Sequence, residues 1–366
     1  MGLKKTKTLA ILFLITAIIV IGMVIVSCGS LITNSTGFSL TYESTLIITP
    51  NDYHKTASFC RIFYVSSLNK FYVIYCGIRQ GTSGILPTDT NYAWREYDAN
   101  LQFTGRCGTL EYVSATDYAA AFDGDYFYML NGNPQGYFLA KYDLNFNRLV
   151  STVISWDSSW ESGSDQMMNY TNGKLYLSTL YDSDRIDSSA VVGMAAGTSY
   201  PHMFIYNTSL EAISDFYLTA ESNIPSGASV IYTNSHFFIV TTNVFPGGDL
   251  YAYKYDSNWN YLDKTFLAAD GQWSQGLIMD NNKYYVAYHV GRHGNGNVAI
   301  GVYDSNWNNL YSKTITNYQD DYNAQRPWLI KVGNKVYISY DVDALIGGTE
   351  EARNWQGYID VYRVNE

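Results

Sequence analysis

Two short motifs alternate along this chain, and each of them occurs six times. The first is a tyrosine at the start of a polar turn, as in YDSNWN, and its tyrosines are Tyr97, Tyr142, Tyr206, Tyr255, Tyr303 and Tyr362. The second is an aromatic residue just after a turn, as in NNKYYVAY, and its aromatic residues are Tyr72, Phe127, Tyr176, Phe238, Tyr285 and Tyr337. Both motifs have a mean spacing of 53 residues, which predicts six copies of one structural unit.

Each motif is typical of two strands joined by a tight turn. The Asn-Asn and Asp-Ser-Asn segments are turn formers that tolerate positive φ or bond their own backbone. The flanking residues are rich in Val, Ile, Thr and Tyr, which favour strands, and 35 of the 366 residues are Tyr. Two hairpins per repeat give four strands, and no stretch after residue 28 has the apolar period of a helix. The sequence therefore predicts an all-β fold.

Six four-stranded repeats resemble the blades of the β-propeller superfamily, whose repeats run to about 40–50 residues. The resemblance covers residues 41–366 and implies a six-bladed β-propeller. The last motif ends at Glu366, one strand short of a blade, and residues 41–49 (TYESTLIIT) resemble the missing strand, so we expect this N-terminal strand to close the ring. The signatures of WD40 repeats, kelch repeats and the sialidase Asp box are absent, so the resemblance implies none of their chemistry.

The N-terminus predicts export and anchoring. Lys4, Lys5 and Lys7 precede an uncharged run over residues 8–26, as in a secretory signal, and this run is also just long enough to span a bilayer. It ends in IVSC, which looks like the lipobox of a prokaryotic lipoprotein signal peptide, where Cys28 would be lipidated. An uncleaved signal anchor and ordinary cleavage are the alternatives. The predicted organisation is a signal peptide or membrane anchor (1–28), a short tether (29–40) and the propeller (41–366).

The charge balance and the N-terminus together constrain location and partners. There are 33 acidic and 23 basic residues, a net charge of −10, and no basic cluster follows residue 7, which argues against nucleic-acid binding. The lysines before the apolar run place everything downstream outside the cytoplasm. We expect a monomer that contacts the membrane through its N-terminus, on the outer face of the cytoplasmic membrane or at the cell surface.

Three cysteines follow Cys28, so at most one disulfide can form among them. If residues 58–77 form a hairpin centred on Leu68, Cys60 and Cys76 lie opposite each other and could be bonded. Two buried reduced thiols are the equal alternative. Three glycosylation sequons, at Asn34, Asn169 and Asn207, could be used or could be chance matches.

The candidate ligand-binding residues come from the variable parts of the repeat. The connection from each second-motif aromatic to the next first-motif tyrosine varies from 15 to 30 residues, and such insertions gather on one face, often the binding face. This face and the links between blades carry Arg79, Asp182, Arg185, His289, Arg292, His293, Asp341, Asp343, Trp160, Trp273 and Trp328. Loop solvation, and wedging of tryptophans between blades, are the alternative roles of these side chains.

No cofactor is indicated by these residues. His289 and His293 lie in a glycine-rich segment, so they are not the helical pair of a zinc protease, and only a weak zinc site with a carboxylate is conceivable. Residues 182–187 (DSDRID) have calcium-like oxygen ligands but not the EF-hand pattern. The resulting hypothesis is a membrane-anchored binding or scaffold module for a glycan or protein partner. The alternative is a polysaccharide-acting enzyme, a glycoside hydrolase or lyase with carboxylates at the channel mouth.

Overall fold

The regular structure of this protein is entirely β-strand within the residues that the computed structural model describes. These residues are 37–48, 57–78, 90–112, 119–133, 136–154, 161–182, 199–218, 228–242, 248–291, 296–318, 322–344 and 354–366. Residues 1–37 and 38–366 are separate units by their contacts, and all of the strands belong to the second unit. In the described part of the chain, no helix is long and apolar enough to cross a membrane.

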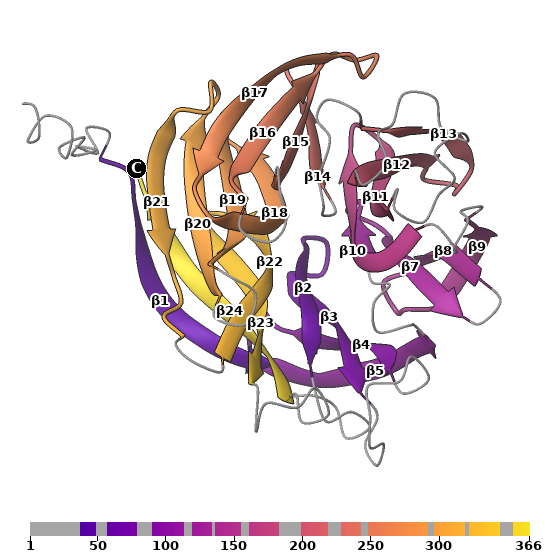
Figure 1. The fold of residues 1–366 in the computed structure, drawn as a ribbon. Coiled ribbons are helices and arrows are strands. Elements are labelled where there is room, and N and C mark those ends of the chain that lie inside the picture. Colours follow the sequence, from indigo (N-terminus) through magenta and orange to yellow (C-terminus); the bar gives the residue numbers. More distant parts are fainter. Residues whose placement is uncertain are drawn as a thin grey trace, which may run out of the picture. The chain divides into compact units, whose positions relative to one another are not determined.

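The strands form six antiparallel sheets of four strands, here called blades one to six (Figure 1). Blades one and two are β2 (Ser58–Val65), β3 (Lys70–Ile78), β4 (Thr90–Tyr97), β5 (Phe103–Tyr112), and β6 (Ala119–Phe122), β7 (Phe127–Asn133), β8 (Gly136–Tyr142), β9 (Arg148–Val153). Blades three and four are β10 (Glu161–Thr171), β11 (Lys174–Asp182), β12 (Ser199–Asn207), β13 (Ala212–Tyr217), and β14 (Ser229–Thr233), β15 (His236–Thr242), β16 (Leu250–Tyr255), β17 (Tyr261–Ala268). Blades five and six are β18 (Gly271–Asp280), β19 (Lys283–Val290), β20 (Asn297–Asp304), β21 (Asn309–Thr314), and β22 (Tyr322–Val332), β23 (Lys335–Ala344), β24 (Asn354–Asn365), β1 (Ser39–Ile48).

The six blades form a ring that the N-terminal strand closes. The first strands of neighbouring blades touch one another, β2 with β22, β6 with β10, β10 with β14 and β14 with β18, so the first strands surround a common axis. Strand β1 pairs with the C-terminal strand β24, from Ser39 opposite Asn365 to Ile48 opposite Gly357. The chain is therefore a six-bladed β-propeller, and the predicted closure of blade six by the N-terminal strand is confirmed for residues 41–48.

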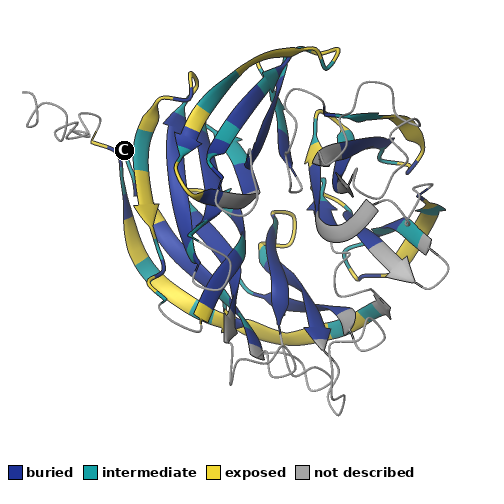
Figure 2. Ribbon diagram, viewed as in Figure 1, coloured by how far each residue is buried: buried dark blue, intermediate teal, exposed yellow. Residues whose placement is uncertain are grey.

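Burial decreases from the second strand to the fourth strand of each blade (Figure 2). Residues 71–77 of β3 and 284–289 of β19 are all buried, because these strands have hydrogen-bonded neighbours on both sides and packed blades on both faces. The outer strands β9 and β21 are mainly exposed. Each apolar cluster combines residues of successive blades; the one that contains Phe238 of blade four and Tyr284 of blade five is an example. The described core thus lies between the blades.

Five turns between third and fourth strands share one hydrogen-bonding pattern, and they begin at Asp98, Asp143, Asn207, Asp256 and Asp304. In the last of them, Asp304 Oδ1 accepts the N–H groups of Asn306 at 2.8 Å and Asn308 at 2.9 Å. The residue between them, Trp307, takes a φ of 64°, and its ring stacks on Tyr284 at 4.0 Å. The fourth residues of three turns also contact a ring of the preceding blade: Trp307 contacts Phe238, Trp259 contacts Tyr176 and Phe146 contacts Trp94. These turns therefore pack at the seam between blades, which gives the predicted turn residues a structural role.

The predicted pairing of Cys60 with Cys76 is wrong in register. Cys76 lies opposite Ser58, because a bulge adds a residue to β2 between Ser58 and Arg61. Both cysteines are buried thiols with no disulfide between them, which agrees with the alternative hypothesis. Burial, reinforced by the negative charge of Asp341, raises the pKa of the Cys60 thiol well above its ordinary value.

Candidate functional site at the bulged first strands

The two faces of the propeller differ in the lengths of their connections. On one face, the segments between second and third strands range from two residues (134–135) to sixteen (183–198). On the opposite face, the turns between first and second strands have two to four residues, and those between third and fourth strands have four or five. The variable face also receives the links from one blade to the next. Insertions in repeat proteins gather at a binding face, so the variable face is the candidate.

Four of the six first strands have a bulge at the same height. The extra residues lie between Ser58 and Arg61 in β2, Ser162 and Met167 in β10, Gln272 and Gly276 in β18, and Gln325 and Trp328 in β22. In each case the bulge faces one equivalent residue of the second strand, which is Tyr75, Thr179, Tyr288 or Tyr340. Bulges of this kind re-aim side chains and are common beside functional sites.

Two bulge residues, Phe59 and Arg326, have φ values of 51° and 54°. A side-chain-bearing residue in this region costs about 1–3 kcal/mol, and such strain clusters at functional sites. The Arg326 guanidinium lies 3.9 Å from the centre of the Phe59 ring and 5.2 Å from that of Trp355. It also donates to Asp341 Oδ2 at 2.8 Å, and the Asp341 side chain is fully buried. The two bulges thereby join blades one and six through an arginine, a carboxylate and two aromatic rings.

Arg61 lies inside the channel, although only 1% of its surface is exposed. Its guanidinium contacts Met167 Sδ at 3.5 Å and lies 4.6 Å from the centre of the Trp328 ring. These partners come from the first strands of blades three and six, so the side chain reaches across the axis. Trp328 in turn donates from its indole nitrogen to the Ile62 carbonyl at 3.2 Å. The positive charge of Arg61 therefore lies against the Trp328 ring in the interior of the site.

A second polar group lies between blades five and six. His289, fully buried near the end of β19, has its Nε2 3.0 Å from Asn323 Oδ1, which also accepts the Gly296 N–H at 2.9 Å. The Asn323 amide donates to Gln325 Oε1 at 3.0 Å, next to the bulge of β22. This chain of hydrogen bonds connects the β19–β20 segment to the site.

Several predicted site residues lie outside the described residues: Arg79, Arg185, Arg292, His293, Trp160 and the lipidation residue Cys28. Asp182, Asp343 and Trp273 belong to strands, although the repeat pattern predicts them in loops and links. The same correction applies to His289, Asp341 and Trp328. The strands run further than the motifs indicated, because their ladders continue past the bulges.

Trp328 is the clearest of these corrections, since it lies in the channel interior with 8% exposure and not at the mouth. Arg61, Asn323 and Gln325 belong to the site but were not predicted from the sequence. An arginine within the apolar strand SFCRIFYV was the available signal, because an arginine in a buried strand needs a specific environment. Among the described residues, no group of three metal-ligating side chains converges.

The sequon at Asn169 does not suit glycosylation in this fold. Its side chain is 7% exposed, and its Oδ1 accepts the N–H of Val230 at 3.0 Å. Asn207 lies in a turn, where its amide donates to Glu211 at 2.6 Å. Asn34 is outside the described residues.

The opposite end of the channel, on the short-turn face, contains a cavity. A cavity of about 390 Å³ lies where the first strands reach their short turns, and its lining includes Phe63, Phe122, Tyr170 and Trp328. An ion pair of 2.6 Å between Lys331 and Asp280 borders it. This cavity is a second candidate binding place, on the short-turn face. Binding experiments must therefore compare the two faces.

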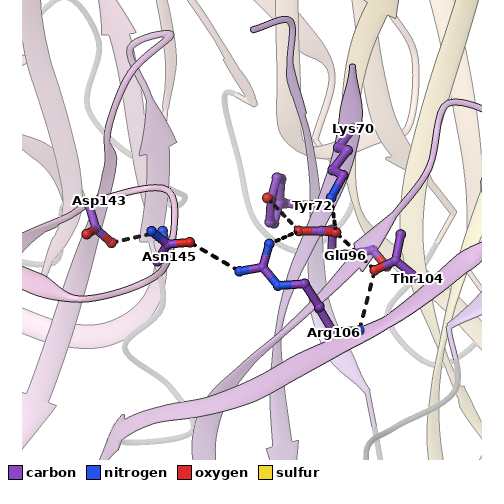
Figure 3. A network of polar contacts seen from close by, with 7 residues as sticks. All are labelled: Lys70, Tyr72, Glu96, Thr104, Arg106, Asp143 and Asn145. Atoms are coloured by element: carbon purple, nitrogen blue, oxygen red, sulfur yellow. Dashed lines mark hydrogen bonds and ion pairs between the residues drawn. The ribbon is translucent and has the colours of Figure 1, made fainter. Parts of the chain in front are cut away.

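One charged network outside the channel has a structural role (Figure 3). The buried Glu96 carboxylate accepts hydrogen bonds from Lys70, Arg106 and Tyr72. Arg106 also donates to Asn145 of blade two at 3.2 Å, which connects the first two blades. Burial alone raises the pKa of Glu96, but these donors outweigh it and hold the pKa below its ordinary value of 4.5.

Comparison with solved structures supports the fold. The neuraminidase-like protein of A/flat-faced bat/Peru/033/2010 matches with a TM-score of 0.51 and 8% identity, over 88% of this chain and 94% of that one. The neuraminidase-like protein of A/little yellow-shouldered bat/Guatemala/060/2010 matches with a TM-score of 0.50 and 9% identity, over 88% of this chain and 99% of that one. No protein-family model matches the sequence, and no curated protein sequence matches it significantly. What this chain shares with these proteins is the propeller architecture.

Proposed function

We propose that this chain is an extracytoplasmic, membrane-anchored propeller that binds a glycan or a protein partner on its variable face. The observation that carries the proposal is the set of four bulges at one height in the first strands. Two of them hold strained residues, and one of these, Arg326, is 13% exposed in its side chain beside aromatic rings. Strained backbone is retained where function needs it, and a channel rim of rings and charges suits stacking on sugars or an extended peptide.

The second candidate is an enzyme acting on polysaccharide. The architecture shared with two neuraminidase-like proteins and the buried Asp341 carboxylate favour it. Asp341 is held by Arg326 at 2.8 Å, which suits a positioned charge better than a proton donor. Fold similarity by itself does not assign a reaction, so binding is the preferred proposal.

The binding proposal is tested on a glycan array and a panel of surface proteins, with the full chain in a mild detergent. Ligands that bind are then compared between two variants, Gly294→Trp in the segment between β19 and β20, and Ser305→Trp in an exposed turn of the opposite face. We expect the first variant to weaken binding at least about tenfold and the second to leave it unchanged. Loss in Ser305→Trp alone would assign the ligand to the short-turn face.

Product analysis separates the two candidates. Chromatography of each bound glycan after long incubation should return the glycan intact if this chain is a binding module. Shortened or unsaturated products that require Asp341 would establish the enzyme instead. Asp341→Glu keeps the negative charge opposite Arg326. Comparing it with a variant that lacks the carboxylate separates loss of the ion pair from loss of a catalytic group.

A further inference from the structure

A pocket at the closing seam of the ring lies apart from the channel site. It has a volume of about 390 Å³ and is lined by β1, β23, β24, β21 and the segment that follows β21. Its lining consists of Tyr42, Thr45, Lys313, Ile315, Thr316, Asn317, Tyr318, Tyr340, Tyr358, Asp360 and Tyr362. We call it the seam pocket. Five of the eleven lining residues are tyrosines.

The pocket contains a carboxylate without a cation. Asp360 is 4% exposed, and within the described part of the chain its two oxygens accept hydrogen bonds only from hydroxyl groups, those of Thr45 at 2.5 Å and Tyr340 at 3.2 Å. No ion pair joins Asp360 to any described residue, and Lys313, exposed at the rim, makes none with it. A buried carboxylate of this kind is costly unless a positive charge approaches it. The contrast with Glu96, which has both Lys70 and Arg106, shows what Asp360 lacks.

The rings around Asp360 pack against one another along the wall of the seam pocket. Tyr340 and Tyr358 stack with centres 5.6 Å apart and planes 16° apart. Tyr42 and Tyr362 meet edge to face at 5.7 Å. Aromatic faces carry negative charge density and attract organic cations, most strongly where water is excluded. The carboxylate and the rings therefore favour the same kind of ligand.

We propose that the seam pocket binds an alkylammonium group, as found in choline headgroups and lysine side chains. The carboxylate supplies the opposite charge, and the tyrosines enclose the methyl or methylene groups. A neutral sugar would use the hydroxyls equally well, but it would not compensate the Asp360 charge. This site is independent of the ligand proposed for the variable face, because its residues belong to the outer part of blade six and its neighbour.

The test uses the full chain in a polyoxyethylene detergent, which presents neither an ammonium group nor a sugar. Choline and lysine amide are titrated by calorimetry at constant ionic strength, and so is the carbon isostere of choline, in which a tert-butyl group replaces trimethylammonium. We expect choline to bind at least about tenfold more tightly than its isostere. Tighter binding of lysine amide than of choline would identify the lysine side chain as the source.

Variants then place the cation in the pocket. Asp360→Asn keeps the shape and removes a buried charge, so we expect it to fold and to bind choline at least about tenfold more weakly. Asp263→Asn, at an exposed position of β17, makes the same change in net charge and should bind as the wild type does. If Asp360→Asn does not fold, the pair Tyr358→Phe (binding retained) and Tyr358→Leu (binding weakened at least about fivefold) decides.

Three results of these titrations would overturn the proposal, and a fourth comes from a neutral sugar titrated in the same way. These are no binding of either cation, equal binding of choline and its isostere, or equal effects of Asp360→Asn and Asp263→Asn. An Asp360-dependent affinity for a neutral sugar in place of the cations would also overturn it.

Discussion

Replacing Glu96 by Gln tests how strongly buried charge holds the first two blades together. The Glu96 side chain is fully buried, whereas Lys70 and Arg106 are 33% and 45% exposed and can return to water. Weakening the charge-assisted bond from Tyr72 costs about 1 kcal/mol. Each half-exposed ion pair contributes about 0.5 kcal/mol after screening by solvent. The expected loss in the free energy of unfolding is thus about 2 kcal/mol.

The corresponding shift in melting temperature follows from the size of the domain. An unfolding entropy of about 2.1 cal/mol/K per residue gives about 0.7 kcal/mol/K for residues 38–366. A loss of about 2 kcal/mol therefore lowers Tm by about 3 °C. Thermal unfolding followed by tryptophan fluorescence, with wild type and variant side by side, measures this shift.

The pH dependence provides a stricter check. The folded pKa of Glu96 lies below its ordinary value of 4.5, so its stabilisation is present above that pH and is lost as the pH falls through the folded pKa. The difference between wild type and Glu96→Gln should be constant near neutrality and shrink well below pH 4.5. Asp125→Asn, at an exposed turn position, should show neither effect. A Tm unchanged in Glu96→Gln, or a difference that grows in acid, would refute this reasoning.

Three further predictions concern other parts of the chain. Trp307→Ala removes the ring stacked on Tyr284, so we expect a loss of about 3–5 kcal/mol, measurable as a Tm lower by about 4–7 °C, with a smaller loss for Trp307→Phe. Gly296→Ala should destabilise the β19–β20 segment, because its Cβ would lie 1.5 Å from His289 Nε2; faster hydrogen exchange there would show it, and unchanged exchange would contradict it. Cys28→Ala should leave the precursor uncleaved and without lipid, and gel mobility and detergent partitioning equal to wild type would instead favour the signal anchor.

The architecture could be predicted from the sequence because each blade is a local unit. Turn residues such as those at Asp304 bond their own backbone, and the strands alternate with them at a fixed period. The closing strand was predictable for the same reason, since residues 41–49 repeat the pattern that the last repeat lacks. The turns and strands are determined by nearby residues, so they can be recognised in the sequence without knowing how the blades pack.

The bulges and the sites depend on contacts that no local pattern records. An extra residue in β2 leaves the apolar run SFCRIFYV unchanged in appearance, yet it moves Cys60 out of register with Cys76. Arg61 meets Met167 and Trp328 only because three blades share an axis. Thr45 bonds to Asp360, and Tyr42 lines the seam pocket, only because strand β1 pairs with β24 in blade six. Sequence thus determined the repeating unit, whereas ring closure decided which side chains meet, because the packing of distant segments fixes their register and their neighbours.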